Sequence, residues 1–225
     1  MIVGNFVSLE ALSAVSACTW ICNIFNYTFH GLGMGAGILV ARYYGAKDKE
    51  KLKKALDSSI MFAIVGGLLL TLVSELSLPI LMRICNIGPD IYMDAQAYLR
   101  VYLLGNSAVL TSVMCFNMLR SFGDTKHQLY YSITGSIVNL IFGILFVRVF
   151  KMDVVGAALA TIISQFIIDF LSLRLILNLS DEFKFNIKDI HFGFDIIWEV
   201  CRLGIPAGVQ NMLIGISSMA VQSYV

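Results

Sequence analysis

Long apolar segments separated by short polar stretches dominate the hydrophobic pattern of the chain. About 20 apolar residues cross the hydrocarbon core of a bilayer as a helix. No strand-like alternation of apolar and polar positions occurs, and only helices or closed barrels cross membranes. The pattern predicts an all-α, polytopic transmembrane bundle with five full spans, a sixth that begins at Leu203, and the tail of an earlier span at Met1–Val7. The apolar runs cover residues 11–41, 58–82, 97–119, 129–150, 154–178 and 203–225.

The composition agrees with a membrane protein and excludes several other classes. Hydrophobic residues make up 58% of the chain, charged residues 14%, and the mean hydropathy is +0.80. Soluble domains carry about 25% charged residues, and a single soluble core of this length could not bury so much apolar surface. The net charge of +1 gives no sign of a nucleic-acid partner. The cysteines lack disulfide or metal-site spacing, which favours a packing role for them; they are Cys18, Cys22, Cys85, Cys115 and Cys201.

Both ends of the chain lie within apolar sequence. No basic residues precede the first apolar stretch, so a cleaved signal peptide is not expected. A membrane protein rarely stops in the middle of a span. We therefore expect a fragment in which helix sequence is missing at both ends.

Basic residues collect in alternate polar stretches, which predicts the orientation of the chain in a cell membrane. In bacterial multi-pass proteins the side richer in Lys and Arg is cytoplasmic. The segment Lys47–Lys54 is therefore predicted to be cytoplasmic, and the turn at Lys151 external. The predicted inner side holds 12 of the 16 Lys and Arg residues, and the other side holds Arg83, Arg100, Arg148 and Lys151.

Small residues recur at spacings that suit close helix contacts. The four glycines Gly31, Gly33, Gly35 and Gly37 contain two GxxxG pairs, and Gly156, Ala160 and Ser164 form a second stripe. Both patterns let helix backbones approach closely in lipid. GLGMGAG does not follow a strand, and GxxxxGK[ST] is absent from the sequence, so no motif for ATP use is present.

Polar residues inside the apolar runs are the candidates for function, because such groups are costly at membrane depth. Asp169 can pair with Arg174 or face a cavity, and His30 can be a hydrogen-bonded packing residue or a proton switch. Glu75 lies nearer the outer surface and can reach the interface. The remaining candidates are Asn117, near the inner end of its run, Asn139, in the middle of a run, and Thr161.

Asn139 and Thr161 occupy two runs that the turn at Lys151 folds antiparallel. Polar atoms without partners in hydrocarbon cost several kcal/mol, so the two side chains are expected to face one another. Asn139 is farther from the turn than Thr161, and the two share a depth only if one helix is kinked or starts lower. An Asn can also bridge helices with no other role.

Six segments resemble the multidrug and toxic compound extrusion (MATE) family, and they cover essentially the whole chain. Within the family the sequence is most similar to bacterial efflux proteins of the Clostridium-like type. The phrases GAKDKEKL, LRSFGDTK and GAALATIISQ together carry most of the resemblance. The segments are VGNFVSLEALSAVS (3–16), GLGMGAGILVARYYGAKDKEKL (31–52), YLRVYLLGN (98–106), NMLRSFGDTK (117–126), VFKMDVVGAALATIISQ (149–165) and RLGIPAGVQ (202–210).

The resemblance implies a twelve-helix transporter built from two six-helix lobes around a V-shaped cavity. It assigns residues 1–180 to the N-terminal lobe with a truncated helix one, 181–198 to a cytoplasmic linker, and 199–225 to the start of helix seven. It implies export of cationic or amphipathic organic compounds from a bacterial cell, coupled to entry of Na⁺ or H⁺, with no cofactor and no metal beyond Na⁺. The partners implied are the bilayer, the substrates and the second lobe, which lies outside this chain.

The same resemblance identifies a cation site and two departures from it. Family members with a site in this lobe often read N-x-x-x-D in helix five, followed by a Thr in the GAALAT segment. Asn139 and Thr161 match the Asn and the Thr, but Gly143 stands at the Asp position. A further Asp that often precedes the VGNF motif would lie upstream of Met1. Neutral oxygens alone bind Na⁺ weakly and cannot carry a proton, so the resemblance implies coupling through that upstream Asp or through the other lobe. Asn117 matches an Asn of the helix-four motif and is a candidate cavity residue.

Three other functions are alternatives to ion-coupled export. A flippase for lipid-linked saccharides belongs to the same superfamily, but such cavities are usually rich in Arg and Lys, and here Arg100 is the only basic residue well inside a span. A truncated or degenerate protein that acts as an interaction partner is favoured by Gly143 and opposed by the preserved loop motifs. An intramembrane enzyme has no support, because no metal motif, serine–histidine arrangement or paired carboxylates occur at helical spacing.

The charge bias yields a direct test of orientation. In the intact protein without native cysteines, Lys151→Cys should react with a membrane-impermeant thiol reagent added to whole cells. Lys49→Cys should react only after the cells are permeabilised, because the basic turn is predicted to face the cytoplasm. Labelling of position 49 but not of position 151 in intact cells would overturn the predicted topology.

Overall fold

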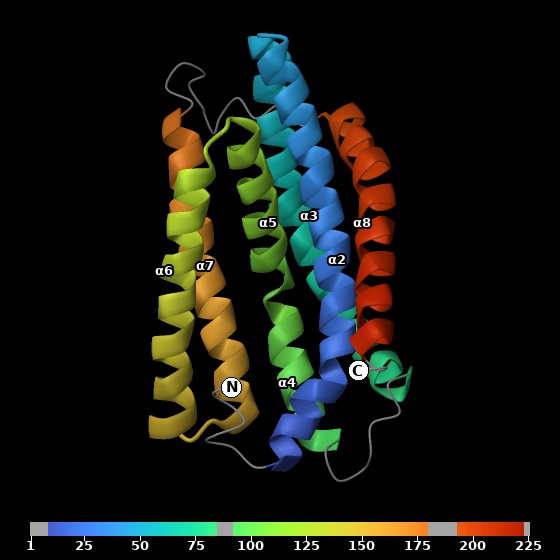
Figure 1. Cartoon of the computed structure of the whole chain (residues 1–225), viewed down its shortest axis with the longest axis vertical. Coiled ribbons are helices and arrows are strands. Elements are labelled where there is room, and N and C mark those ends of the chain that lie inside the picture. Colours follow the sequence, from blue (N-terminus) through green and yellow to red (C-terminus); the bar gives the residue numbers. More distant parts are fainter. Residues whose placement is uncertain (1–8, 85–91, 180–192, 223–225) are drawn as a thin grey trace.

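The chain folds into a bundle of long helices that run roughly along one axis (Figure 1). The computed structural model describes residues 9–84, 92–179 and 193–222, and every regular element in these ranges is helical. The predicted all-α bundle is therefore confirmed. The elements are α2 (Leu9–Gly45), α3 (Lys49–Ile84), α4 (Tyr92–Leu104), α5 (Asn106–Ser121), α6 (Thr125–Ile144), the π-helical segment η2 (Leu145–Val149), α7 (Asp153–Leu179) and α8 (Phe194–Gln222).

Four helical segments of the described chain are long and apolar enough to cross a membrane: Ile21–Gly45, Lys49–Arg83, Thr125–Val149 and Val154–Leu177. A fifth span results if α4 and α5 are taken together as one helix that is bent by 47° at the break between them. The sequence pattern predicted this third span as continuous, but it breaks at Gly105. A Cβ at Gly105 would lie 2.7 Å from the Ile162 side chain, so the glycine also allows α7 to approach the break.

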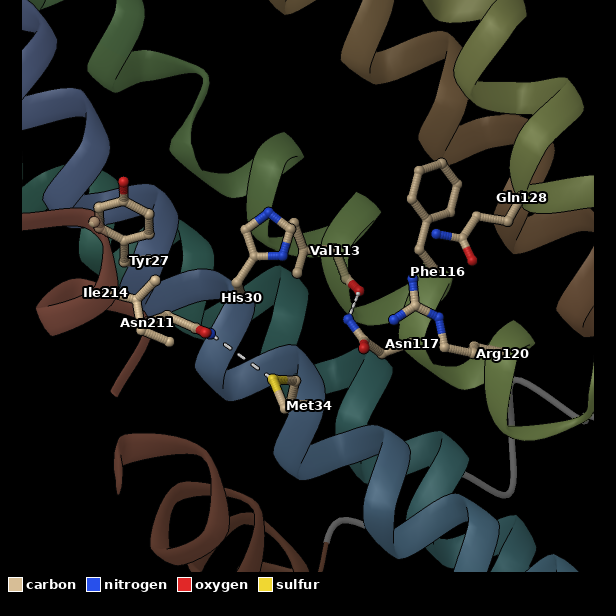
Figure 2. Close-up of a pocket in the computed structure, with 11 residues that line it drawn as sticks. Tyr27, His30, Met34, Val113, Phe116, Asn117, Arg120, Gln128, Asn211 and Ile214 are labelled. Carbon is tan, nitrogen blue, oxygen red and sulfur yellow. Dashed lines mark hydrogen bonds between the residues drawn. The ribbon is translucent and has the colours of Figure 1, made fainter. Parts of the chain in front are cut away.

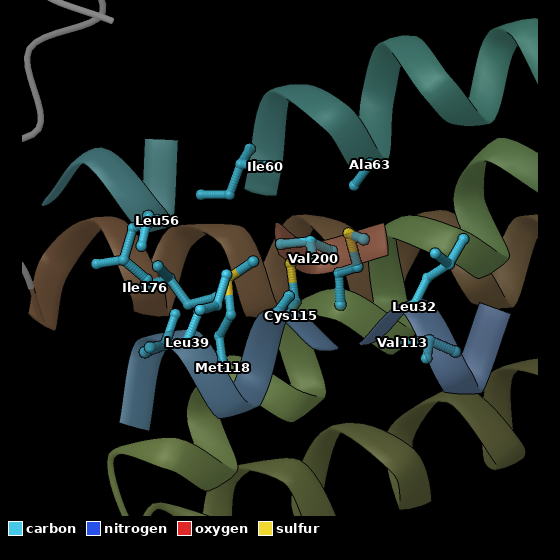
Figure 3. Close-up of a cluster of buried hydrophobic side chains, with 14 of the residues drawn as sticks. Leu32, Leu39, Leu56, Ile60, Ala63, Val113, Cys115, Met118, Ile176 and Val200 are labelled. Carbon is cyan, nitrogen blue, oxygen red and sulfur yellow. The ribbon is translucent and has the colours of Figure 1, made fainter. Parts of the chain in front are cut away.

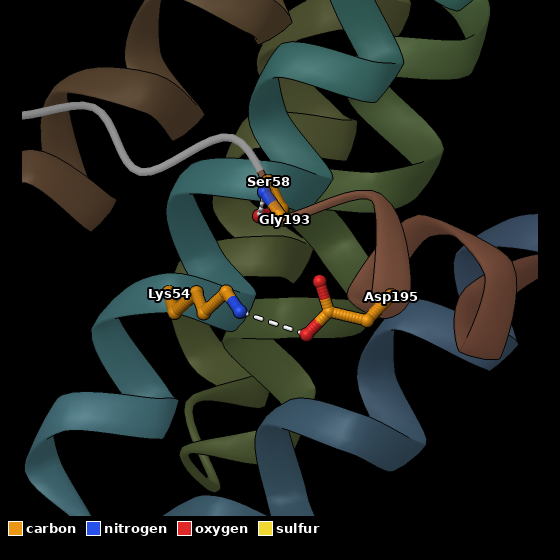
Figure 4. Close-up of polar contacts among 4 residues, drawn as sticks. All are labelled: Lys54, Ser58, Gly193 and Asp195. Atoms are coloured by element: carbon orange, nitrogen blue, oxygen red, sulfur yellow. Dashed lines mark hydrogen bonds and ion pairs between the residues drawn. The ribbon is translucent and has the colours of Figure 1, made fainter.

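The last helix begins earlier than the apolar pattern indicated. α8 starts at Phe194, so neither Leu203 nor position 199 marks its beginning, and Pro206 lies inside it. The first turns of α8 are polar enough to lie outside the apolar run, and two ion pairs join them to neighbouring helices. Asp195 contacts Lys54 of α3 at 2.7 Å (Figure 4), and Glu199 contacts Arg42 of α2 at 3.0 Å.

The polar turns lie at opposite ends of the bundle in the order that the sequence indicated. The α2–α3 turn, the α5–α6 turn and the start of α8 share one end, whereas the α6–α7 turn lies at the other (Figure 1). Lys47 and Lys151 are therefore at opposite ends, and which end faces the cytoplasm stays a prediction. The expected helix tail at Met1–Val7, Cys85, and Lys184 and Lys188 of the linker lie outside the described residues.

Side-chain caps lie at the first turns of α3 and α6, at the end of the bundle that holds the α2–α3 and α5–α6 turns. Asp48 accepts a hydrogen bond from the backbone N–H of Lys51 at 3.1 Å, and Asp124 accepts one from the backbone N–H of His127. Such caps satisfy backbone donors that a helix start leaves without partners. The Lys51 amide, followed by the Lys51 ammonium, lowers the pKa of the Asp48 carboxyl below its ordinary value.

The two GxxxG pairs of α2 face two different helices. A Cβ at Gly31 would lie 2.3 Å from the backbone nitrogen of Gly208, and one at Gly35 would lie 2.4 Å from the Val200 carbonyl, both on α8. Gly33 and Gly37 instead face α5, where added Cβ atoms would lie 2.8 Å and 3.2 Å from the Asn117 side chain. The spacing in the sequence thus corresponds to two close helix contacts on two sides of one helix.

The main hydrophobic cluster lies between α2, α3, α5, α7 and α8 (Figure 3). Its members include Leu39, Leu56, Cys115 and Val200, and most are almost fully buried. A second cluster joins α2, α3 and α4 around Cys18 and Cys22. Cys18, Cys22 and Cys115 are buried among apolar neighbours, which confirms that they fill the core.

The contact between α2 and α8 can be tested by adding a single methyl group. Gly31→Ala should destabilise the intact protein by about 1–3 kcal/mol, because the α8 backbone must move to admit the Cβ. Gly45→Ala is the matched control, since nothing lies within 4 Å of a Cβ there and alanine favours helix. Thermal unfolding in detergent measures both variants, and equal melting temperatures would show that α2 and α8 are not in contact.

Candidate functional site: polar hollows beside α2

Two adjoining hollows open beside α2, and three residues line both of them: His30, Val113 and Phe116. The Asn117 hollow, of about 570 Å³, lies between α2, α5, α6 and α8. The Asn139 hollow, of about 430 Å³, lies between α2, α5, α6 and α7. A polar concavity assembled by four helices at membrane depth is the kind of site at which transport proteins bind small molecules.

The Asn117 hollow combines aromatic, amide and basic side chains (Figure 2). Asn117 donates a hydrogen bond from Nδ2 to the Val113 carbonyl at 2.8 Å within α5. Across the hollow, Asn211 of α8 lies 3.8 Å from the sulfur of Met34. The structure therefore places Asn117 in the wall of this hollow, and its role in a substrate cavity stays a prediction. The complete lining is Tyr27, His30, Met34, Val113, Phe116, Asn117, Arg120, Gln128, Asn211, Ile214 and Gly215.

Asn139 and Thr161 face one another in the second hollow, which confirms the predicted contact. Asn139 donates from Nδ2 to the Thr161 hydroxyl at 3.2 Å, and Thr161 donates to the Ala157 carbonyl at 3.1 Å. The π-helical segment Leu145–Val149 lies between Asn139 and the turn at Lys151.

This pair offers neutral ligands only. The Asn139 and Thr161 side chains provide an amide and a hydroxyl oxygen, and the buried Gly143, one turn from Asn139, adds no side-chain ligand. Among the described residues, no group of three or more His, Cys, Asp or Glu side chains could hold a metal ion. Hard cations bind most tightly to carboxylates, so Na⁺ binding by this pair stays a prediction, and its neutral ligands alone favour only weak binding.

Asp169 is a residue of α7 that is buried where this helix packs against α5. It does not form an ion pair with Arg174. Its Oδ1 accepts a short hydrogen bond from the Ser112 hydroxyl of α5. Ser112 also contacts Gln165 Oε1 at 2.9 Å. Ser112 and Gln165 line the Asn139 hollow, and Asp169 lines an apolar crevice of about 300 Å³ on the other side. The sequence singled out Asp169 but not Ser112, because a serine in an apolar run carries no signal of its own.

His30 and Glu75 have different surroundings. The His30 side chain is exposed toward both hollows, so it forms part of their shared wall and is not packed in the core. Glu75 lies away from the hollows, and its Oε2 pairs with the Nε of Arg100 on α4 at 3.6 Å. The two charges that the sequence placed in separate spans therefore compensate one another.

Comparison with known proteins gives consistent similarities. The MatE family model matches residues 1–145. The probable multidrug resistance protein YoeA of Bacillus subtilis is 25% identical over the whole chain and 50% of its own length. The multidrug export protein MepA of Staphylococcus aureus is 26% identical over 99% of the chain and 49% of its own length. The chain thus spans about half the length of these relatives.

Solved structures show the same fold. An inward-facing multidrug resistance MATE family transporter of the MOP superfamily covers 96% of the chain with a TM-score of 0.86, at 23% identity and over 49% of its own length. An outward-facing conformation of such a transporter covers 99% with a TM-score of 0.87, again at 23% identity and over 50% of its length.

The contribution of the hydrogen bond between Asn139 and Thr161 to the stability of the protein can be measured. Thr161→Val should lower the free energy of unfolding of the intact protein by about 1 kcal/mol, because the Asn139 amide loses its partner in α7. Thr161→Ser should restore most of it. Thr134→Val is the control, since the Thr134 hydroxyl donates to the Tyr130 carbonyl of its own helix. Equal losses for the two valine variants would contradict a contribution from the bond between helices.

Proposed function

Because the chain belongs to the MatE family, we propose that the intact protein is a secondary active exporter of small organic compounds that works by alternating access. The chain spans about half the length of its curated relatives. In this proposal it supplies one lobe, with α8 as the first helix of the other. The observation that carries the proposal is the pair of adjoining hollows that share His30, Val113 and Phe116.

The linings of the hollows favour organic cations and amphipathic compounds as substrates. Tyr27 and Phe116 supply aromatic faces, which attract cations, and Asn117, Asn139 and Asn211 supply amides. Two relatives carry names that describe them as a multidrug export protein and a probable multidrug resistance protein. A mixture of aromatic faces and neutral polar groups binds varied substrates without a strict geometric requirement.

Alternating access requires a lobe that moves as a unit. The described fold matches an inward-facing and an outward-facing transporter almost equally well, with TM-scores of 0.86 and 0.87. This supports a lobe that keeps its fold while the cavity opens first to one side and then to the other. Substrate and ion binding would shift the balance between the two states.

Ion coupling through Na⁺ or H⁺ completes the proposal. The neutral pair Asn139 and Thr161 lies in the hollow that adjoins the Asn117 hollow and shares Phe116 with it, so a bound cation and a substrate would compete or cooperate there. A lipid-linked saccharide flippase is less favoured. Arg100 pairs with Glu75 outside the hollows, and Arg120 is the one arginine or lysine that lines either of them in the described part of the chain.

Transport by the intact protein tests the proposal. In proteoliposomes, an imposed Na⁺ or H⁺ gradient should drive movement of a fluorescent organic cation such as ethidium. Asn117→Ala should reduce the rate about fivefold, equivalent to ~1 kcal/mol for one lost hydrogen bond. Leu140→Ala, which alters an exposed side chain of α6 outside both hollows, should leave the rate unchanged.

Two controls sharpen the result. The 225-residue chain alone should not catalyse transport, because one lobe cannot enclose a cavity that needs two. A folded, full-length protein that moves no cation under either gradient would contradict the proposal and favour a non-transporting membrane protein.

A further inference from the structure

Asp169 is an acidic side chain held deep within a membrane span. It lies 15 residues beyond Val154, or roughly 22 Å along α7 at 1.5 Å per residue, and is only 7% exposed. Among the described residues, no basic side chain forms an ion pair with it. Glu75 differs in this respect, because Arg100 pairs with it. A carboxylate buried in hydrocarbon without a paired cation is costly, so Asp169 is expected to be stabilised in another way.

The contacts of Ser112 indicate how the Asp169 carboxyl group is accommodated. A serine hydroxyl has a single proton to donate, yet two acceptors lie against Ser112 Oγ: Asp169 Oδ1 and Gln165 Oε1, the latter at 2.9 Å. Gln165 and Asp169 are four residues apart and therefore share one face of α7. Both contacts are hydrogen bonds at once when Asp169 is protonated. Its carboxyl O–H then donates to Ser112 Oγ, and the Ser112 O–H donates to Gln165 Oε1.

Loss of that proton forces a rearrangement. The Ser112 hydroxyl then donates to the Asp169 carboxylate and has nothing left for Gln165. The Gln165 amide regains a hydrogen bond by turning over, so that its NH₂ group donates to Ser112 Oγ. In that state Gln165 Oε1 is released toward the Asn139 hollow, which Gln165 helps to line.

We propose that Asp169, Ser112 and Gln165 form a proton-binding site that sets whether the wall of the hollow presents an acceptor or a donor. This inference rests on the proposed export function and gives it a coupling ion. In the deprotonated state an organic cation meets the Gln165 carbonyl and the nearby negative charge. When a proton binds to Asp169, both attractions are lost and the cation is released. One proton therefore takes the place of one positive charge of the substrate, as the exchange of a proton for an organic cation requires.

The surroundings of Asp169 leave it as the acidic group of this site. From α5, the neutral, buried Cys115 thiol lies near Asp169. From α2, His30 lies across the Asn139 hollow, and Arg174 of α7 is exposed near Tyr131 of α6. The side toward α3 is apolar and lined by Ile64 and Leu68, and the lining residues from α6 are Ser132, Gly135, Ser136 and Asn139. Ser112 is the residue that links Asp169 to the Asn139 hollow.

Infrared difference spectroscopy of the purified intact protein tests the proton site without any substrate. A carbonyl band of a protonated carboxyl group should appear as the pH is lowered, and it should be absent from Asp169→Asn. Glu75→Gln is the matched control, because it removes the other described carboxylate of a membrane span that the sequence singled out. A band that persists unchanged in Asp169→Asn would overturn the proposal.

Binding of ethidium to the same preparations tests the link to the hollow. In wild type and Glu75→Gln, each bound cation should release up to about one proton, and affinity should fall by up to about tenfold per pH unit under acidic conditions. Asp169→Asn, which lacks the negative charge, should bind ethidium weakly, without proton release or pH dependence. Ser112→Ala should show a smaller pH dependence than wild type, because only the link from Asp169 to Gln165 is lost. Ser112→Ala keeps the carboxyl group, so its infrared band should remain.

The outcomes separate this proposal from the proposed function. Proton release that persists in Asp169→Asn, or pH-independent binding in wild type, would refute the switch while leaving export of cations in place. Absence of ethidium binding to wild type, with a titrating Asp169 band, would refute cation export and uphold the proton site.

Discussion

The close approach of α2 to two helices at once is the contact on which the rest of the bundle depends. Gly31 and Gly35 admit the backbone of α8, and Gly33 and Gly37 admit α5. In lipid the hydrophobic effect does not drive helices together, so backbone proximity and dispersion must hold them. A side chain at these glycines would separate α2 from its neighbours. It would also displace the walls of both hollows, because His30 belongs to α2 and Val113 and Phe116 belong to α5.

Several polar groups inside the bundle have hydrogen-bond partners on other helices. Ser112 joins α5 to α7 through Asp169, and Asn139 joins α6 to α7 through Thr161. Each bond satisfies a group that hydrocarbon would leave without a partner. The bonds gather on α7 and beside the Asn139 hollow, so the groups that stabilise this lobe are also those that its chemistry would use. Stability and function therefore cannot be varied independently at these positions.

The end of the bundle that carries the basic turns ties α8 to the lobe by a different kind of contact. Arg42–Glu199 and Lys54–Asp195 are ion pairs between exposed side chains, and Ser58 accepts a hydrogen bond from the Gly193 amide (Figure 4). Exposed pairs of this type contribute about 0–1 kcal/mol each. Such contacts can form and break at little cost, in contrast to the tight glycine contact farther along α8.

The sequence by itself determined the class of the protein, because hydrocarbon imposes a length and a polarity on every span. The apolar runs placed the helices, the glycine spacing in α2 indicated close contacts, and the few polar residues in these runs included Asn139, Thr161, Asn117 and Asp169. The break at Gly105 and the early start of α8 at Phe194 escaped the pattern. A single glycine is compatible with a continuous helix, and the start of α8 is too polar to resemble a membrane span.

The turn between α6 and α7 predicted that Asn139 and Thr161 face one another, but only the tertiary structure decided that Ser112 meets Asp169 and Gln165. Ser112 lies in another helix, far from both in the chain, so no local pattern could join it to them. Depth was equally inaccessible from sequence, since Asn139 and Thr161 meet although they lie at unequal distances along the chain from the turn at Lys151. The sequence thus specified the groups available for chemistry, because burial in lipid makes each polar residue conspicuous. Packing specified their partners, because helix rotation and depth are set by contacts with neighbouring helices.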